Sequence, residues 1–521
     1  MGGLAAASRL SVLPRPAGRA GQVTGELISF ATKAEVLASA ERYWNPDKTR
    51  FWQGAGLPLV IGRREGYVLH DVTGKRLIDM HLNGGTYNLG HRNPEVIAAV
   101  TEAMAYFDVG NHHFPSVART ALAQELVRTA TDGIAKVMFG SGGGEAVDLA
   151  LKSARQATGR RRIVSVVKAY HGHTGLAVAT GDERFARMFL ADRPDEFTHV
   201  PFNDADAMER ELAAGDVAAV IMETIPATYG FPLPAPGYLK AVKELCERNG
   251  TLYIADEVQT GLMRTGELWA ITKYGVAPDL LVTGKGLSGG MYPVTAVLAT
   301  ERAAAWLSRD GFAHMATFGG AEVGCVAALR CLEITTRPEV RAASHHIAAF
   351  FTVGLDQIRS KYPDWFTGVR QDGLVMGLEF AHPQGAKFVM RRLYDHGVWA
   401  IFSTLDPRVL QYKPGLLLDP ATAAEVLDKT EAAIGEAREE AMREPGNSNK
   451  PAPPRQPAPS APGDATPSSP GTGLPEEGAP LLDLPHFPAD PAARALLAGR
   501  LAAWAARGDA PYPRPSNARE G

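Results

Sequence analysis

Residues 253–300 read YIADEVQTGLMRTGELWAITKYGVAPDLLVTGKGLSGGMYPVTAVLAT. The apolar runs TLYIA and DLLVT predict two buried strands. The first run is followed by Asp256 and Glu257, and the second by Gly284, Lys285 and Gly286. Glycines on both sides of a lysine let a ligand approach closely. An acid and an amine at two strand ends therefore predict a site that holds a cationic ring nitrogen and a carbonyl carbon together.

Composition bounds the class of protein. The 521 residues are 45% hydrophobic and 21% charged, which indicates a globular chain of two or three domains. A formal net charge of −3 gives no reason to expect nucleic acid or an acidic membrane as the main partner. Three cysteines without metal-like spacing favour a reducing cytoplasm and no metal, and no apolar run is long enough to span a membrane.

From about residue 135 the chain alternates between strands and helices. The apolar runs KVMFG, RIVSVV, VAAVIMET, LYIADE, DLLVTG and PVTAVLAT are separated by stretches of helical pattern. Strands that are apolar on both faces predict an α/β fold with a mostly parallel sheet covered by helices. Ligands of such sheets bind at the carboxyl ends of the strands, where the unusual residues fall.

Composition also divides the chain into domains and tails. We expect a large domain over 91–337 and a smaller α+β domain built from 31–90 and 338–444. Within them, a helix is predicted over 32–50, and VLQYKPGLLLD is predicted to be a strand. Residues 1–30 are expected to be a disordered tail, although the acid-free first 24 residues also resemble a targeting segment.

The C-terminal part has a different composition. Residues 445–480 form a proline-rich linker, and 481–521 form an appendage with one amphipathic helix. One helix has no core of its own. It could dock on the main body, bind a partner or substrate, or remain poorly ordered, and the sequence leaves these alternatives open.

A glycine-rich turn precedes a predicted helix in FGSGGGEAVDLALKSAR. The N–H groups of Gly143 and Gly144 would face an anion at the helix N-terminus. The dinucleotide fingerprint fails because Glu145 occupies its third glycine, and the P-loop fails because Asp279 occupies its first. A phosphate is therefore expected, without NAD or ATP being indicated. The alternative is an ordinary tight turn between strand and helix.

Tyr170 follows another predicted strand, where its ring could stack on a flat ligand. The histidines beside it, His171 and His173, are as readily explained as polar loop residues. No third ligand suggests a metal.

Several motifs occur together in one order: NLGHRNPEV, SGGGEAVDLALKSAR, YHGHT, DEVQTGLMRTGELWA, DLLVTGKGLSGGMYP and HMATFGG. With these motifs the chain resembles the class III pyridoxal-phosphate aminotransferases of fold type I, over roughly residues 45–440. The resemblance implies an enzyme that moves an amino group from an amine donor to a carbonyl acceptor. It also implies a homodimer with its active site at the interface, and pyridoxal 5'-phosphate in the large domain.

The resemblance assigns the chemical steps to two residues. Lys285 would form the Schiff base with the cofactor aldehyde and, once freed, act as general base for a proton shift. Asp256 would keep the pyridine nitrogen protonated, so that the ring can accept electrons.

Further residues would bind the cofactor by the same resemblance. Gln259 would hydrogen-bond the ring hydroxyl, while Val258 and Tyr170 pack on opposite ring faces. Gly143 and Gly144 would hold the phosphate, together with a further residue, Thr317, contributed by the other subunit.

The chain departs from the family where substrates bind. Many members carry an arginine for the substrate α-carboxylate at the position of Gln411. Many also carry a glutamate that covers this arginine at the position of Thr228, five residues after Glu223. Losing a buried arginine–carboxylate pair costs about 1.5–3 kcal/mol. We therefore expect an amine, ketone or aldehyde without an adjacent carboxylate, such as a modified peptide end or another natural-product intermediate.

The chain departs from the family at three further positions, and the same scaffold allows other reactions. Gly142 stands where serine is usual, and Ala321 and Glu322 where Asn-Pro is usual; we expect these to alter loop detail only. A phospho-lyase, decarboxylase or aminomutase would use the same ring-binding residues. An inactive binding or scaffold protein is the alternative of another class, and it is disfavoured by the intact Asp256, Gln259 and Lys285.

Overall fold

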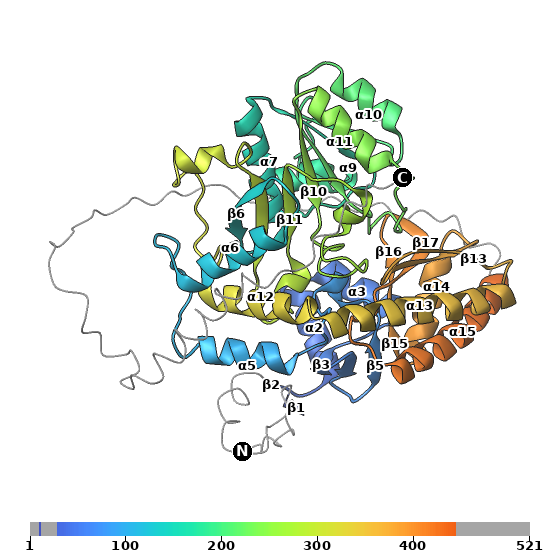
Figure 1. Ribbon diagram of the computed structural model, residues 1–521. Helices are drawn as coiled ribbons and strands as arrows, with labels where there is room; N and C mark the ends of the chain where they lie inside the picture. The colour runs from blue at the N-terminus through green and yellow to red at the C-terminus, as the bar shows by residue number, and fades with distance from the viewer. Residues whose placement is uncertain (1–9, 12–28, 444–521) are drawn as a thin grey trace, which may run out of the picture. The chain divides into compact units, whose positions relative to one another are not determined.

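The computed structural model describes residues 10–11 and 29–443 (Figure 1). The predicted linker and appendage, and most of the predicted N-terminal tail, lie outside the described residues. Two short strands within the range of that tail pair antiparallel, β1 (Leu10–Ser11) with β2 (Ser29–Phe30).

A seven-stranded sheet forms the centre of the large region. Strands β11, β10, β9, β7 and β8 run parallel to one another, and β12 runs antiparallel to both β11 and β6. The strands in spatial order are β6 (Ile134–Gly140), β12 (Thr295–Thr300), β11 (Leu280–Thr283), β10 (Leu252–Asp256), β9 (Val217–Glu223), β7 (Arg162–Val166) and β8 (Phe197–Val200). This arrangement confirms the predicted α/β fold with a mostly parallel sheet. The sequence prediction missed β8, whose FTHV is short and half polar.

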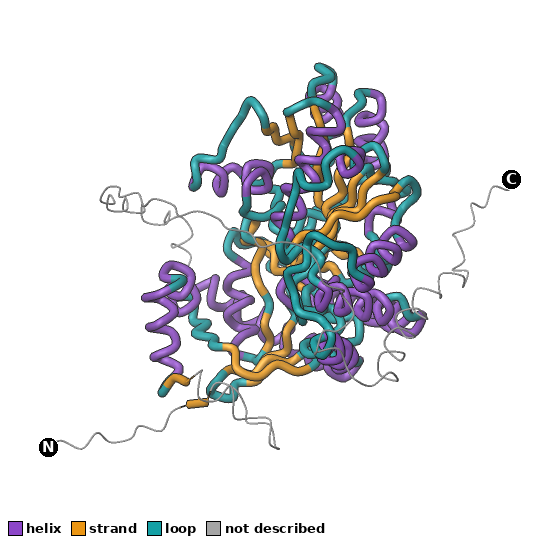
Figure 2. The backbone as a smooth tube through the Cα atoms, turned by 90° about the vertical axis from the view of Figure 1, so that its left-hand side faces the viewer, coloured by secondary structure: helices purple, strands orange, loops and turns teal. Residues whose placement is uncertain are grey.

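Helices cover this sheet on both sides (Figure 2). Helix α7 (Gly143–Thr158) packs across β6, β9, β10, β11 and β12, while α11 (Tyr238–Arg248) packs on β10. Helix α7 starts directly after the glycine-rich turn and ends at Gly159, whose φ of +67° suits glycine. Its first turn carries Glu145, which accepts hydrogen bonds from the N–H and hydroxyl of Ser141 at 2.8 and 2.7 Å. These features fix the start of the helix beside the strand ends.

The helices before and after the sheet-forming segments differ partly from expectation. The predicted helix over 32–50 is two helices, α2 (Lys33–Tyr43) and α3 (Pro46–Gly54). Pro46 explains the break, since the residue before a proline disfavours helical geometry. Helices α5 (Pro94–Ala103), α6 (Val117–Thr129) and α12 (Glu322–Thr335) flank the sheet-forming segments, and α12 packs against the other two.

A second region combines both ends of the described chain. One sheet has the order β13 (Phe366–Asp372), β14 (Val375–Phe380), β17 (Asp406–Tyr412) and β16 (Ile401–Ser403). The other has the order β15 (Val398–Trp399), β5 (Arg76–Asp79), β4 (Val68–Asp71) and β3 (Ile61–Glu65). N-terminal strand β5 thus pairs in parallel with C-terminal strand β15. Figure 1 shows blue β5 beside orange β15.

Three helices cover these sheets: α13 (Pro338–Lys361), α14 (Gly385–Asp395) and α15 (Pro420–Arg443). Their buried faces share one apolar core with β5, β14 and β17. The predicted strand VLQYKPGLLLD is too long, because β17 ends at Tyr412. Pro414 explains this end, since proline has no N–H for a sheet ladder.

Candidate active site

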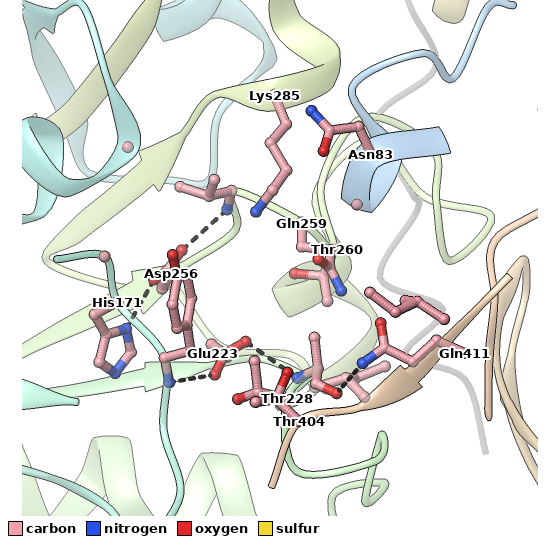
Figure 3. A pocket seen from close by; sticks show the side chains of 18 of the residues that line it. Asn83, His171, Glu223, Thr228, Asp256, Gln259, Thr260, Lys285, Thr404 and Gln411 are labelled. Carbon is pink, nitrogen blue, oxygen red and sulfur yellow. Dashed lines mark hydrogen bonds and ion pairs between the residues drawn. The ribbon is translucent and has the colours of Figure 1, made fainter. Parts of the chain in front are cut away.

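A pocket of about 450 Å³ lies at the carboxyl ends of the parallel strands and extends to β16 and β17 (Figure 3). It collects nearly all the residues predicted for the site in this chain. Those that line it are Gly143, Gly144, Tyr170, Glu223, Thr228, Asp256, Val258, Gln259, Lys285 and Gln411. Thr317 does not line it and is exposed. The contribution of Thr317 to a second subunit stays a prediction.

Lys285 enters the pocket directly after β11. Its backbone has a φ of +44°, in the left-handed region that costs energy for a residue with a side chain. A Cβ added to Gly84 would lie 3.0 Å from the Lys285 Cε, so the chain passes close to the amine. Burial lowers the pKa of Lys285, although nearby Asp256 and Glu223 act to raise it. The neutral amine, which is the nucleophilic form, is thereby favoured.

Asp256 ends β10 and is nearly buried. Its Oδ2 lies 2.8 Å from His171 Nδ1, and its Oδ1 accepts the N–H of Val258 at 3.1 Å. A carboxylate only accepts hydrogen bonds, so Nδ1 of His171 carries the proton. Its Nε2 lies 3.4 Å from the Ser165 hydroxyl. His171, interpreted from sequence as an ordinary loop residue, therefore orients the acid of the pocket.

Glu223 ends β9 and pairs in register with Asp256. Its two oxygens accept the N–H groups of Tyr170 at 3.0 Å and Ala227 at 3.1 Å. Burial raises the pKa of Glu223 to about 7, and nearby Asp256 adds to the rise. This carboxyl group joins the loop after β7 to the loop after β9, and it changes charge near neutral pH.

Glu257 follows Asp256 but does not line the pocket. Successive residues of a strand face opposite sides, so only one of the two carboxylates reaches the ligand. The Glu257 carboxylate is buried and accepts four hydrogen bonds. The donors are the hydroxyls of Thr224 and Thr260 and the N–H groups of Ala270 and Ile271. Glu257 is therefore a structural acid that anchors the loop after β10.

The glycine-rich turn forms a crowded cradle. Gly143 and Gly144 are the first residues of α7, where backbone N–H groups lack helical acceptors. A Cβ on Gly144 would lie 2.7 Å from the Thr174 hydroxyl oxygen, and one on Gly172 would lie 2.6 Å from the Gly144 Cα. Gly144 and Gly172 therefore have no room for a side chain, whereas a Cβ on Gly143 would make an ordinary contact with Val258 at 3.5 Å.

The opposite part of the pocket carries neutral side chains. Thr228 donates its hydroxyl to the Lys168 carbonyl at 3.3 Å. Gln411 projects from β17, and Figure 3 shows it on a different side of the pocket from Lys285. Ile401, Phe402 and Thr404, which sequence reasoning missed, complete this side. Alternation along β16 puts the consecutive residues Ile401 and Phe402 on opposite faces, so it could not have found the three residues together.

The described part of the chain has neither a metal-binding cluster nor a membrane-spanning helix. No group of three or more histidine, cysteine or acidic side chains there could hold a metal ion. No helix described in residues 29–443 is long and apolar enough to cross a membrane.

Comparisons with known proteins identify the family. The family described as aminotransferase class-III matches residues 52–434, so the chain belongs to the class III aminotransferases. It is 40% identical over 402 residues to an uncharacterized aminotransferase of Archaeoglobus fulgidus, covering 77% of this chain and 94% of that protein. It is 32% identical over 421 residues to a putrescine aminotransferase of Pectobacterium atrosepticum, covering 78% and 89%.

Solved structures agree with this assignment. The ornithine aminotransferase of Toxoplasma gondii superposes with a TM-score of 0.72 at 25% identity, covering 79% of this chain and 96% of that one. That crystal structure holds pyridoxal phosphate at partial occupancy in its active site. The protein is therefore an aminotransferase of fold type I, and its family implies pyridoxal phosphate as the cofactor.

Proposed function

We propose that this aminotransferase acts on an amine donor and a ketone or aldehyde acceptor, at least one of which lacks an α-carboxylate. The observation that carries the proposal is the charge of the pocket wall. Among the described residues that line the pocket, Lys285 is the only lysine or arginine. Its amine is needed for the chemistry, so none of the other described lining residues is a lysine or arginine that could pair with a substrate carboxylate.

The residues present fit pyridoxal 5'-phosphate. Gln259 has a buried Nε2 without a hydrogen-bond partner, suited to the ring hydroxyl. The N-terminus of α7 suits the phosphate, and Asp256 suits a ring cation. When bound, the cofactor supplies an aldehyde carbon and a ring that accepts electrons.

Each neighbouring residue then has a role of its own. With the cofactor bound, Lys285 would be the amine that meets its aldehyde, and it would hold or move the proton at the substrate Cα. Asp256 would keep the ring nitrogen protonated, and His171 orients Asp256. Tyr170 and Val258 line the pocket and would hold the ring in place.

A relative supports the substrate class. The relative at 32% identity is named for putrescine, which is a diamine without a carboxylate. Natural-product intermediates and modified peptide ends belong to the same chemical class of amines and carbonyl compounds. The proposal concerns that class and not putrescine itself.

We also propose a homodimer. Phe312, Met315 and Phe318 lie within five residues of Thr317 in the sequence, and they are 72%, 58% and 51% exposed. Exposed apolar residues gathered in one segment are typical of an interface. A second copy that covers them would explain their exposure. Light scattering of the purified protein measures its mass, and Phe312→Asp is expected to shift it toward the monomer.

A matched pair of donors tests the substrate class. 1-Butylamine and L-norvaline differ only by the α-carboxylate, and cofactor absorbance reports the first half-reaction with each. We expect kcat/KM to favour butylamine, and Gln411→Arg to shift the ratio toward norvaline by about tenfold or more. Gln53→Arg, on exposed α3, is the control. Equal use of both donors by the native enzyme would refute the proposed substrate class.

A further inference from the structure

We propose that three groups hold Gln411 so that it cannot bind a substrate carboxylate, which makes Ser403 and Lys413 specificity-determining positioning residues. The three groups are the Ala227 carbonyl, the Ser403 hydroxyl and the Lys413 amine, together named the Gln411 clamp. The inference rests on the proposed function, since it concerns how the same pocket turns carboxylates away.

Every hydrogen of the Gln411 amide is already engaged. Nε2 donates to the Ala227 carbonyl at 2.9 Å and to the Ser403 hydroxyl oxygen at 3.1 Å. Oε1 accepts from Lys413 Nζ. A carbonyl oxygen can only accept, so Ala227 fixes which end of the amide is nitrogen. Lys413 has hydrogens to donate whether its amine is charged or neutral, and the orientation holds in both states.

The sheet explains why these groups meet. Gln411 lies on β17 between two partner strands, opposite Gly377 of β14 and Ile401 of β16. Ser403 is two residues from Ile401 on β16, and Lys413 is two residues from Gln411. Side chains two apart along a strand lie on the same face. The register of β16 against β17 shifts between Phe402 and Ser403, and Lys413 directly follows the end of β17. The hydrogen bonds, and not alternation alone, therefore place both side chains beside Gln411.

The Ala227 carbonyl, the remaining group of the clamp, is held in place by its own hydrogen bonds. The N–H of Ala227 donates to Glu223 at 3.1 Å, and its carbonyl also accepts the N–H of Gly230 at 3.1 Å. Figure 3 shows this connection from Glu223 through the loop to Gln411. Turning the Gln411 amide would break buried hydrogen bonds at both of its ends, which is costly.

A carboxylate in the pocket meets no free N–H of Gln411 at this clamp. The Ser403 hydroxyl still has a hydrogen to donate, but Ser403 is fully buried and does not line the pocket. A carboxylate offers only acceptor oxygens and needs N–H or O–H groups in return. An amide has two N–H groups, and both serve Ala227 and Ser403. Lys413 is fully buried, its Nζ lies 5.3 Å from the centre of the Phe231 ring, and it does not line the pocket. Its amine therefore acts on a ligand only through Gln411.

Two substitutions test the clamp with the donors norvaline and butylamine. Ser403→Ala releases one N–H of Gln411, and Lys413→Met releases Oε1 so that the amide can turn. We expect each to raise the norvaline-to-butylamine ratio of kcat/KM by roughly three- to tenfold, as one new hydrogen bond to a charged group would. Lys387→Met is the matched control, because Lys387 Nζ lies 5.0 Å from the Phe402 ring on the same side of the pocket.

A binding measurement without turnover accompanies the kinetics. Pentanoate is norvaline without its amine, and calorimetric titration into the holoenzyme measures its dissociation constant. Ser403→Ala is expected to tighten pentanoate binding by a similar factor, and Lys387→Met to leave it unchanged. A purely structural role of Ser403 would alter the melting temperature without changing either the ratio or pentanoate affinity.

The outcomes separate the clamp from the proposed function. The clamp alone is overturned if the native enzyme discriminates against norvaline, both variants keep this discrimination, and pentanoate affinity does not change. Equal use of the two donors by the native enzyme overturns the proposed function and the clamp with it. If Lys413→Met does not fold, Ser403→Ala decides, since it removes a single oxygen atom.

Discussion

His171 Nδ1 lies 2.8 Å from Asp256 Oδ2, and the two side chains are buried together at the end of β10. His171→Phe removes the donor that orients this carboxylate. Hydrogen bonds to charged groups contribute about 1.5–3 kcal/mol, so pyridoxal phosphate is expected to bind roughly ten- to a hundredfold more weakly. Fluorescence titration of the apoenzyme measures this affinity. His173→Phe, at an exposed neighbouring histidine, serves as control. Unchanged affinity in His171→Phe would show that Asp256 needs no orienting partner.

Glu257→Gln is expected to destabilise the protein by about 2–3 kcal/mol. Each Glu257 oxygen accepts one hydroxyl and one backbone N–H. Whichever way the glutamine amide turns, its NH2 group faces a backbone N–H, so that one buried backbone N–H loses its acceptor. Chemical denaturation of the apoenzyme measures the loss. Glu436→Gln, in an exposed pair with His396, should cost less than about 1 kcal/mol. Equal stability of the two variants would contradict the structural role of Glu257.

Gly172→Ala is expected to weaken binding of pyridoxal phosphate by about tenfold or more. The new Cβ would lie 2.6 Å from the Gly144 Cα, and φ at Gly172 is +109°. The helix N-terminus must therefore shift. Gly142→Ser is the control, because a Cβ there meets nothing within 4 Å and φ is −142°. If both variants bind the cofactor alike, the cradle does not depend on this close approach.

The pH dependence of stability follows from Glu223. Its pKa is raised from 4.5 to about 7 by burial, so between these values the folded state keeps a proton that the unfolded state has lost. The contribution of Glu223 to the free energy of unfolding is present below pH 4.5 and decreases by about 3 kcal/mol as the pH rises to 7.

Denaturation of the apoenzyme at several pH values tests this dependence. Glu223→Gln cannot titrate, so the difference in unfolding free energy between native and variant protein should fall with rising pH in that window and level off above it. A constant difference from pH 4.5 to 7 would show that Glu223 stays ionised in the folded protein.

The residues around Lys285 were predictable because their signal is local. Apolar strands, flanking glycines and strand-end polar residues occur within a few positions of one another, and parallel strands bring such ends together. The partnership of His171 with Asp256 joins residues 85 positions apart, so no local pattern reveals it. The direction of Glu257 was within reach, because strand alternation separates it from Asp256.

Helix α13 and the clamp show the same contrast. The buried residues of α13 recur every three or four positions, and this period could have been found from sequence. Ser403 ends β16, and Lys413 directly follows β17. Their bonds to Gln411 still depend on the pairing of β16 with β17 and on side-chain reach, which a sequence pattern does not carry.

The pairing of β5 with β15 bears on how the chain is made. Ile78 lies opposite Val398, so a ribosome adds more than 300 residues after β5 before its partner strand exists. Strands β3, β4 and β5 emerge early, and an unpaired strand edge invites pairing with other chains. Contacts so distant in sequence also slow folding. The second region, which carries Gln411, therefore forms late, and the substrate side of the pocket is completed only after more than 400 residues have been synthesised.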